Sequence, residues 1–273
     1  MKIYGRRMLL YSILIGAAIV IGFPFVWMIF TSFKPETEIV RFPPALWPES
    51  VSFTSYLGVW HRIPFLKFFK NSVIFASGVT LISLLLDSMA AYAFARLKFR
   101  GRNVLFVLVL VALMIPVQVT MIPLFIMLNK FGWIDTYAGL IIPRATNAFG
   151  IFMLRQFFIG LPKELDESAR IDGCSEFRLY WQIIMPLAKP AIASLALFHF
   201  MYNWNDLLWP LIITNSDALR TLPAGLALFM GQHVVEYGIL TAGAAIALAP
   251  LVIAFLMAQK YFIQGIAFTG IKD

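Results

Sequence analysis

Long runs of uncharged, apolar residues recur along this chain of 273 residues and restrict its fold more than any other feature. An α-helix rises about 1.5 Å per residue, so about 20 apolar residues cross the hydrocarbon core of a bilayer. Only 13% of the residues are charged, against roughly 25% in soluble domains. The sequence therefore predicts an all-α polytopic membrane protein and excludes a soluble fold.

Six segments are apolar and long enough to be predicted as transmembrane helices. They cover residues 8–31, 72–95, 104–128, 137–154, 187–212 and 242–259. The first superficially resembles a signal peptide, but its apolar run is too long for one, so we expect a spanning helix kinked near Pro24. Pro143, Arg144 and Asn147 interrupt the fourth. We expect one transmembrane domain over residues 1–273, with its core at 71–262.

Lysine and arginine residues are concentrated on one side of the predicted spans. That side has Lys2, Arg6, Arg7, Arg96, Lys98, Arg100, Arg102, Arg155, Lys163, Arg170, Arg178, Lys189, Lys260 and Lys272. Cytoplasmic loops carry an excess of these residues, so both termini are predicted to be cytoplasmic. The net charge of +8 is not gathered into one stripe, so it indicates topology and not a nucleic-acid partner.

The predicted extracytoplasmic loop, residues 34–70, is long and contains Pro35, Pro43, Pro44 and Pro48. Proline removes a backbone donor and restricts the chain, so we expect an ordered loop with little helix. Just before the second span, Phe65, Leu66, Phe68 and Phe69 alternate with lysines. This pattern is typical of a short helix at the membrane interface.

The predicted cytoplasmic loop, residues 162–186, is not explained by topology alone. Pro162 suits the first turn of a helix, and Glu164, Asp166 and Glu167 complement the positive end of its dipole. Gly173 supplies a left-handed stop. The loop is therefore expected to be a docking surface for a partner protein, although a solvated turn between spans would also carry such charges.

A second helix is expected over residues 176–185 of this loop. Phe177, Tyr180, Trp181 and Ile184 recur at spacings of three and four, which gives one apolar face against the membrane. We expect Pro186 to end this helix before the fifth span.

The loop resembles the cytoplasmic motif of bacterial ABC importer permeases, EAA, three residues, G, nine residues and I-x-L-P. Glu167-Ser168-Ala169, Gly173 and Ile183 to Pro186 match it with intact spacing; Ser168 and Met185 are departures. Further stretches resemble the MalG-like subunits of the carbohydrate-uptake branch. They are Thr31 to Pro35, Asn71-Ser72, Ala90 to Leu97, Asn203 to Asp206 with Trp209-Pro210, Thr221 to Pro223 and Gly265 to Lys272.

This resemblance implies a type I ABC importer permease fold with six transmembrane helices in a bacterial or archaeal cytoplasmic membrane. The implied partners are a P-loop ATPase dimer that binds ATP and Mg²⁺, a second permease subunit and an extracytoplasmic sugar-binding protein. The residues implied to dock the ATPase are Glu164, Glu167, Ser168, Ala169, Asp172 and Gly173. By the same resemblance, residues 215–236 would contact the binding protein and the tail 265–273 would reach between the ATPase subunits.

The chain lacks the G-x-x-x-x-G-K-[ST] phosphate loop, so we expect a transport subunit that binds no cofactor, with energy supplied by another subunit. Charged and polar side chains within spans are costly and mark candidate pathways. Asn203, Asn205 and Asp206 are candidates for a sugar route, although packing or water-exposed roles fit them equally well.

Two other functions are compatible with parts of the sequence. An ion-coupled secondary transporter would use intramembrane carboxylates such as Asp87 and Asp206, but it would leave the acidic loop unexplained. A membrane-embedded enzyme would need a catalytic constellation, whereas His61, His199 and His233 are scattered. The single cysteine, Cys174, permits no intrachain disulfide.

Overall fold

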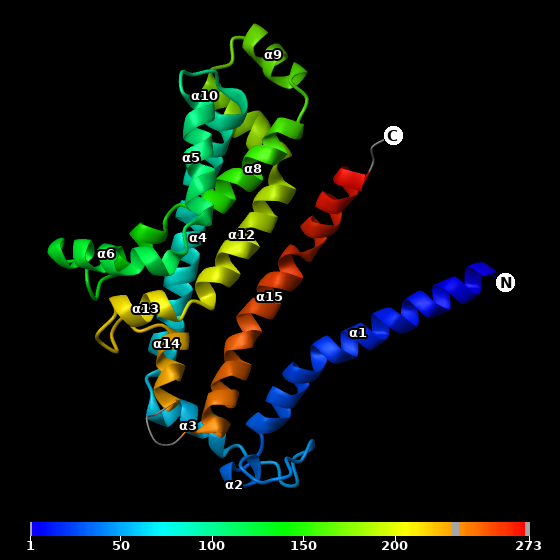
Figure 1. Cartoon of the computed structure of the whole chain (residues 1–273), viewed down its shortest axis with the longest axis vertical. Helices are drawn as coiled ribbons and strands as arrows, with labels where there is room; N and C mark the ends of the chain where they lie inside the picture. The colour runs from blue at the N-terminus through cyan, green and yellow to red at the C-terminus, as the bar shows by residue number, and fades with distance from the viewer. Residues whose placement is uncertain (1, 231–234, 271–273) are drawn as a thin grey trace. The chain divides into compact units, whose positions relative to one another are not determined.

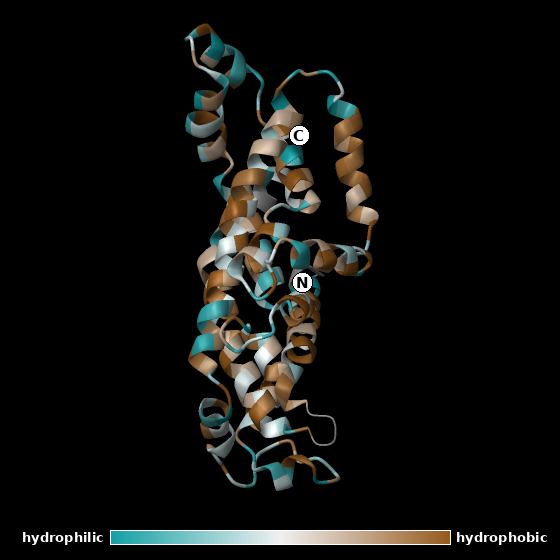
Figure 2. Cartoon of the chain, turned by 90° about the vertical axis from the view of Figure 1, so that its left-hand side faces the viewer, coloured by the Kyte–Doolittle hydropathy of each residue, from teal (hydrophilic) through white to brown (hydrophobic). Residues whose placement is uncertain are grey.

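The computed structural model describes residues 2–230 and 235–270, with side chains described for 6–230 and 235–260. Helices dominate the described residues, which contain no β-strand beyond an isolated bridge between Met230 and Val235. The chain divides into two compact units. The first comprises residues 1–65 and 225–249, and the second comprises 66–224 and 250–273. Figure 1 labels the helices, and Figure 2 shows that the long ones are mostly hydrophobic.

The first unit contains α1 (Lys2–Ser32), α2 (Glu36–Ile39), α3 (Thr54–Arg62) and the beginning of α15 (Tyr237–Gly270). Helix α1 is continuous through Pro24, and its apolar side chains are exposed, as a lipid-facing helix requires. Helix α3 was not predicted in the proline-containing loop. It forms because Val59 and Ser55 are buried on one side of it.

A carboxylate from the beginning of the chain caps the last helix of this unit. The two oxygens of Glu36 accept hydrogen bonds from the backbone N–H groups of Tyr237 (3.1 Å) and Gly238 (3.0 Å). The first N–H groups of a helix lack partners within it, and a negative charge there also complements the helix dipole. An ion pair between Arg62 and Glu236 adds a second connection.

In the second unit, the predicted span 72–95 lies within α4 (Phe65–Arg96). The interfacial residues 65–69 are helical as predicted, but they belong to α4 and do not form a separate helix. Helix α15 is likewise longer than its predicted span of 242–259. Hydropathy locates the apolar part of a helix, whereas hydrogen bonding continues into the polar ends.

The predicted span 104–128 is not one straight helix. It consists of α5 (Arg102–Met114) and α6 (Val117–Lys130), which meet at an angle of 99°. Pro116 has no N–H, and proline disfavours helical geometry in the residue before it. Ile115 accordingly has φ −85° and ψ 117°. The bend in Figure 1 therefore follows from one proline that the hydropathy pattern conceals.

The fourth predicted span is also bent. Helix α7 (Tyr137–Ile141) continues into a 3₁₀ turn (Ile142–Arg144) and then, after a 41° bend, into α8 (Ala148–Gly160). The side chain of Asn147 caps α8 by accepting a hydrogen bond from the N–H of Phe149 at 2.8 Å. The interruption predicted near Pro143 is thus a defined turn.

The loop and fifth span comprise α9 (Glu164–Ile171), α10 (Glu176–Leu179), a π-helical turn (Tyr180–Ile184), α11 (Met185–Leu187), α12 (Lys189–Trp204) and α13 (Leu208–Ile213). The prediction that Pro186 ends a helix is wrong. Pro186 lies in the first turn of α11. The direction changes by 80° between Leu187 and Lys189. The segment 187–212 therefore contains the end of α11, all of α12 and most of α13, and α14 (Leu222–Leu226) follows later in the chain.

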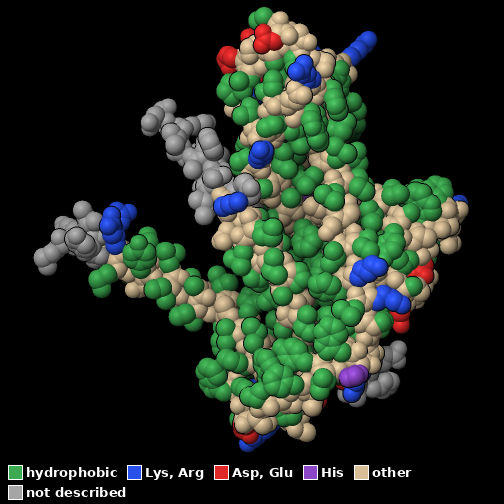
Figure 3. Space-filling view, turned by 180° about the vertical axis from the view of Figure 1, so that it is seen from behind, with side chains coloured by type: hydrophobic (Ala, Val, Ile, Leu, Met, Phe, Trp, Pro, Cys, Tyr) green, Lys and Arg blue, Asp and Glu red, His purple; other side chains and the backbone are tan. Residues whose placement is uncertain are grey.

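By length and composition, three helices are sufficient to cross a membrane, and the described residues offer up to six spans if each bent pair counts as one. Hydrophobic side chains are spread widely over the face shown in Figure 3. In the second unit, one apolar cluster surrounds Leu154, Phe158 and Tyr180, and another surrounds Phe75, Leu140 and Trp209. The first cluster includes Ala169 of α9, which connects the loop to the spans.

Candidate functional site

The loop between α8 and α12 has the helix that the sequence predicts, with one shift at its beginning. Lys163 is the N-cap residue of α9 and Pro162 precedes it, so the proline lies just outside the first turn. The acidic residues Glu164, Asp166 and Glu167 occupy the first turn of α9, where their negative charges stabilise the helix by interacting with the positive end of its dipole.

The end of α9 is a Schellman turn built on Gly173. This glycine has φ +75°, a left-handed conformation that costs other residues energy. The N–H of Cys174 donates to the carbonyl of Ala169 (2.9 Å), and that of Gly173 donates to Arg170 (3.1 Å). These bonds satisfy carbonyl groups that the helix end would leave unpaired. The predicted left-handed stop at Gly173 is confirmed.

The six residues predicted to dock a partner do not share one environment. Glu164, Glu167, Ser168, Asp172 and Gly173 are exposed. Ala169 is only 6% exposed and packs inside the chain's own apolar cluster. Within this chain, Ala169 therefore anchors α9, while the other five present an outer surface with three carboxylates.

A buried ion pair, not predicted from the sequence, joins α9 to the end of α4. Arg96 Nη1 lies 3.1 Å from Asp166 Oδ2, and Arg96 Nη2 donates to the carbonyl of Leu161 at 2.8 Å. The two side chains are 3% and 5% exposed. The sequence predicts Asp166 on the docking surface with the other acids. It lies instead on the buried side of α9 with Ala169, three residues later.

The second half of the loop is held by Glu176. Its carboxylate pairs with Arg170 (2.7 Å) and accepts a hydrogen bond from the Tyr92 hydroxyl (2.7 Å). The bond to Glu176 raises the pKa of Arg170, so this guanidinium stays charged. These contacts fix the orientation of the turn between α9 and α10.

The predicted apolar face of residues 176–185 is divided. Tyr180 and Ile184 are buried, and the hydroxyl of Tyr180 shares a hydrogen bond with Ser88 at 2.8 Å. Phe177 and Trp181 are 68% and 53% exposed. The π-helical turn over Tyr180–Ile184 adds residues per turn and breaks the spacing on which the prediction depended.

Inside the second unit, Asp87 connects three segments. It is completely buried, and Oδ1 accepts hydrogen bonds from Thr146 Oγ1 (2.7 Å) and the N–H of Asn147 (3.0 Å). Its Oδ2 lies 3.1 Å from His199 Nε2. A Cβ on Gly150 would lie 2.2 Å from that same Oδ2, so only glycine fits there. The Asp87 carboxylate, which an ion-coupled transporter would use, thus has structural partners on both oxygens.

The three predicted pathway residues have different surroundings. Asn203 is buried and donates to the carbonyl of His199 (2.7 Å), whereas Asn205 is exposed. Asp206 pairs with Arg144 and accepts a hydrogen bond from the N–H of Trp209 at 3.2 Å. Of these three residues, Asn205 and Asp206 line a cavity of about 820 Å³, which Tyr202 also lines.

Aromatic rings near this ion pair were not predicted as part of the site. The guanidinium carbon of Arg144 lies 5.4 Å from the centre of the Tyr202 ring and 5.7 Å from that of Trp209. Arg144 and both rings, with Asn203, line a second cavity of about 500 Å³. Aromatic faces beside hydrogen-bonding groups can bind a polar ligand with apolar ring faces.

Among the residues that the structure describes, no group of three or more His, Cys, Asp or Glu could hold a metal ion. The predicted contacts of the tail 265–273 lie outside the residues whose side chains are described, as does His233. Residues 231–234 of the predicted binding-protein loop are also outside.

Comparison with known proteins gives consistent matches. Residues 83–268 match the family described as binding-protein-dependent transport system inner membrane component. The trehalose/maltose transport system permease protein MalG of Thermococcus litoralis is 38% identical, covering 98% of this chain and 97% of that protein. The arabinooligosaccharides transport system permease protein AraQ of Bacillus subtilis is 37% identical, covering 92% and 90%.

A third relative is the sn-glycerol-3-phosphate transport system permease protein UgpE of Yersinia enterocolitica, 30% identical over 96% of each chain. A solved structure is also similar, with a TM-score of 0.82 and 24% identity over 96% of this chain and 97% of that one. It is a bacterial ABC transporter involved in the import of the acidic polysaccharide alginate. This likeness shows the fold.

Proposed function

Because the chain belongs to the family of binding-protein-dependent transport system inner membrane components, we propose that it is one permease subunit of an ATP-driven importer for a sugar, an oligosaccharide or a related polyol. The observation that carries this proposal is similarity over nearly the whole chain to permeases for trehalose/maltose and arabinooligosaccharides. A glycerol phosphate permease among the relatives extends the range to polyols.

The partners follow from this role. A P-loop ATPase dimer supplies energy with ATP and Mg²⁺, a second permease completes the pathway, and an extracytoplasmic binding protein delivers the solute. The two termini and α9 lie in the cytoplasm, in accordance with the distribution of lysine and arginine. Residues 71–262 form the core permease domain, with 34–70 outside and 162–186 inside.

The outer surface of α9 is the ATPase contact. Glu164, Glu167 and Asp172 are exposed there, whereas Ala169 and Asp166 attach the helix to the spans. A movement imposed on α9 therefore reaches α4 through the ion pair of Asp166 with Arg96. Such a connection supports alternating access, in which ATP binding shifts the spans between two orientations.

The solute pathway includes Asn205 and Asp206, with Tyr202 beside them on the same cavity. Asn203 contributes from the adjacent cavity that also contains Arg144. Hydroxyl groups of a sugar can exchange hydrogen bonds with the amides and the carboxylate, while its C–H face packs on the aromatic ring.

Purification with all co-eluting subunits tests the assembly. The chain is extracted from its native membrane in mild detergent, and every associated protein is identified by mass spectrometry. We expect a P-loop ATPase and a second, different permease. Elution of the chain alone, under conditions that keep related complexes intact, would refute the proposal.

Reconstitution in nanodiscs tests the cargo and the docking surface. ATP hydrolysis is measured with the binding protein and a panel of maltose, trehalose, arabinooligosaccharides and glycerol phosphate, and one class is expected to stimulate it. Glu167→Ala should abolish this stimulation, because losing one partner of a desolvated charge pair costs about 2 to 5 kcal/mol. Glu49→Ala is the control. It removes an exposed acid that is distant from Glu167 in sequence and belongs to the first unit, so this variant should hydrolyse ATP normally.

A further inference from the structure

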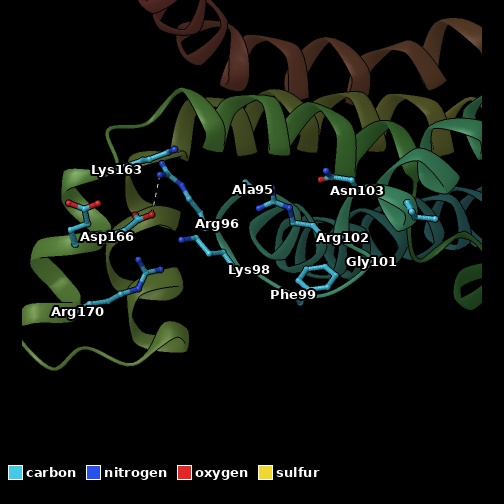
Figure 4. A pocket seen from close by; sticks show the side chains of 12 residues that line it. Ala95, Arg96, Lys98, Phe99, Gly101, Arg102, Asn103, Lys163, Asp166 and Arg170 are labelled. Carbon is cyan, nitrogen blue, oxygen red and sulfur yellow. Dashed lines mark hydrogen bonds and ion pairs between the residues drawn. The ribbon is translucent and has the colours of Figure 1, made fainter.

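A cavity of about 770 Å³ lies between α9 and the turn that joins α4 to α5, and of the residues on the outer surface of α9 only Glu167 lines it. Figure 4 shows it from close by. Its basic side chains are Arg96, Lys98, Arg102, Lys163 and Arg170, against two carboxylates, Asp166 and Glu167. The cavity therefore carries a net positive charge, which the pairing of Arg170 with Glu176 reduces but does not cancel.

Some of these cations have partners and others do not. Arg96 pairs with Asp166, Arg170 pairs with Glu176, and Arg102 donates to the carbonyl of Leu97 at 3.1 Å. Lys98 and Lys163 take part in none of the ion pairs found among the described residues. In Figure 4, Lys98 extends from the turn toward α9 and Arg170 faces it from that helix.

A buried donor on the wall of the cavity is also unsatisfied. Arg96 Nε has no hydrogen-bond partner, although the Arg96 side chain is only 3% exposed. Leaving a buried charged donor unpaired is costly, and such groups are usually satisfied by a ligand or an ion. Arg96 lines the cavity, so its incompletely paired guanidinium adds to the positive charge there.

The first turn of α5 contributes a further positive end. Gly101, with φ +83°, is its N-cap residue and provides no side-chain acceptor for the backbone N–H groups that follow. Gly101, Arg102, Asn103 and Val104 all line the cavity. A helix N-terminus with uncapped N–H groups favours a phosphate or a carboxylate.

The surroundings indicate where such an anion comes from. The cavity lies where α4 ends and α5 begins, and the side chains of Val104, Leu105, Val107 and Leu108 on α5 are 48% to 66% exposed. This apolar surface starts at the edge of the cavity, as acyl chains attached to a bound headgroup would require. Anionic phospholipids are attracted to basic residues next to a span in the same way.

The geometry points to a binding site for a phosphate-bearing anion between α9 and the α4–α5 turn, with the headgroup of an anionic phospholipid as the source that the apolar surface of α5 favours. Lys98 and Lys163 bind it from the two sides, and the Arg96 guanidinium and the first turn of α5 add positive charge from within. The bound group would hold α9 against the spans. This site does not depend on the identity of the transported solute.

Native mass spectrometry of the purified full-length chain, with its associated subunits in detergent, measures lipid retention. Dioleoylphosphatidylglycerol is compared with dioleoylphosphatidylcholine, and inorganic phosphate is followed separately by ³¹P line broadening. The test variant is Lys98→Gln with Lys163→Gln. The matched control is Arg100→Gln with Lys130→Gln, which removes the same charge from exposed residues that do not line the cavity. Lys98→Arg with Lys163→Arg tests rescue.

Selective retention of phosphatidylglycerol by the wild type, the control and the arginine variant, with roughly thirtyfold weaker binding in the glutamine variant, establishes a lipid site. Phosphate broadening that disappears only in the glutamine variant, without lipid selectivity, establishes the site with free phosphate as its ligand. Equal lipid retention and equal phosphate broadening in the wild type and the glutamine variant overturn the proposal. Loss of the ATPase during purification would refute the proposed function and leave this readout intact.

Discussion

Removing one member of the Arg96–Asp166 pair should loosen α9 from the spans. In Asp166→Ala, the buried guanidinium keeps only its bond to the carbonyl of Leu161. Breaking a buried ion pair on one side costs about 3 to 5 kcal/mol. Arg96 Nε and Asp166 Oδ1 are unpaired already, so we expect the lower end, about 3 kcal/mol. Opening of α9 should become more than about a hundredfold more frequent.

Hydrogen–deuterium exchange of peptides from α9 measures this opening directly. The double variant Arg96→Met with Asp166→Leu should recover most of the protection, because replacing both charges by apolar groups removes the unpaired charge. Glu164→Ala, on the exposed side of the same helix, serves as the control and should exchange nearly like the wild type, because an exposed first-turn acid contributes only about 0.3 to 1 kcal/mol. Exchange in Asp166→Ala equal to that control, or a double variant less protected than Asp166→Ala, would refute the reasoning.

Three further changes follow from single contacts. Gly150→Ala should lower thermal stability by about 2 kcal/mol or more, because the new Cβ would lie 2.2 Å from Asp87 Oδ2; an unchanged melting temperature would contradict this. Gly173→Val should lower the stimulated ATP hydrolysis and expose α9 to protease more than Gly173→Ala does, since φ at this residue is +75°. Equal cleavage of both variants would be inconsistent with the left-handed stop. Burial raises the pKa of Asp135, but hydrogen bonds from Ser216 and Asn215 outweigh it, so the pKa is lowered overall. The contribution of Asp135 to the free energy of unfolding is therefore present above about pH 4 and is lost as the pH falls further. Exchange of residues 213–217 should rise in that acidic window in the wild type and stay flat in Asp135→Asn.

The parts of the fold that sequence predicted well depend on local rules. Gly173 adopts the left-handed conformation expected of a glycine after a helix. Asn147, identified as an interruption, caps α8 with its side chain. Both results need only the chemistry of one residue and its immediate neighbours, which a sequence contains.

The parts that it missed depend on direction and on distant partners. A hydropathy window reports the length of an apolar segment and not its course, so the 99° bend at Pro116 was hidden within one predicted span. The inward orientation of Asp166 required Arg96, which lies 70 residues away. The π-helical turn at Tyr180–Ile184 likewise changed which aromatic side chains are buried.

The cap on α15 has a consequence for the order in which the contacts of the protein can form during synthesis. Glu36 accepts hydrogen bonds from residues 201 and 202 positions later in the chain. A ribosome adds about 5 to 20 residues per second, so roughly 10 to 40 seconds separate the synthesis of the two partners. During that interval Glu36 and Arg62 lack the partners that residues 236–238 later provide. The first unit is thus completed only when residues 225–249 have been made, although its residues 1–65 are made first.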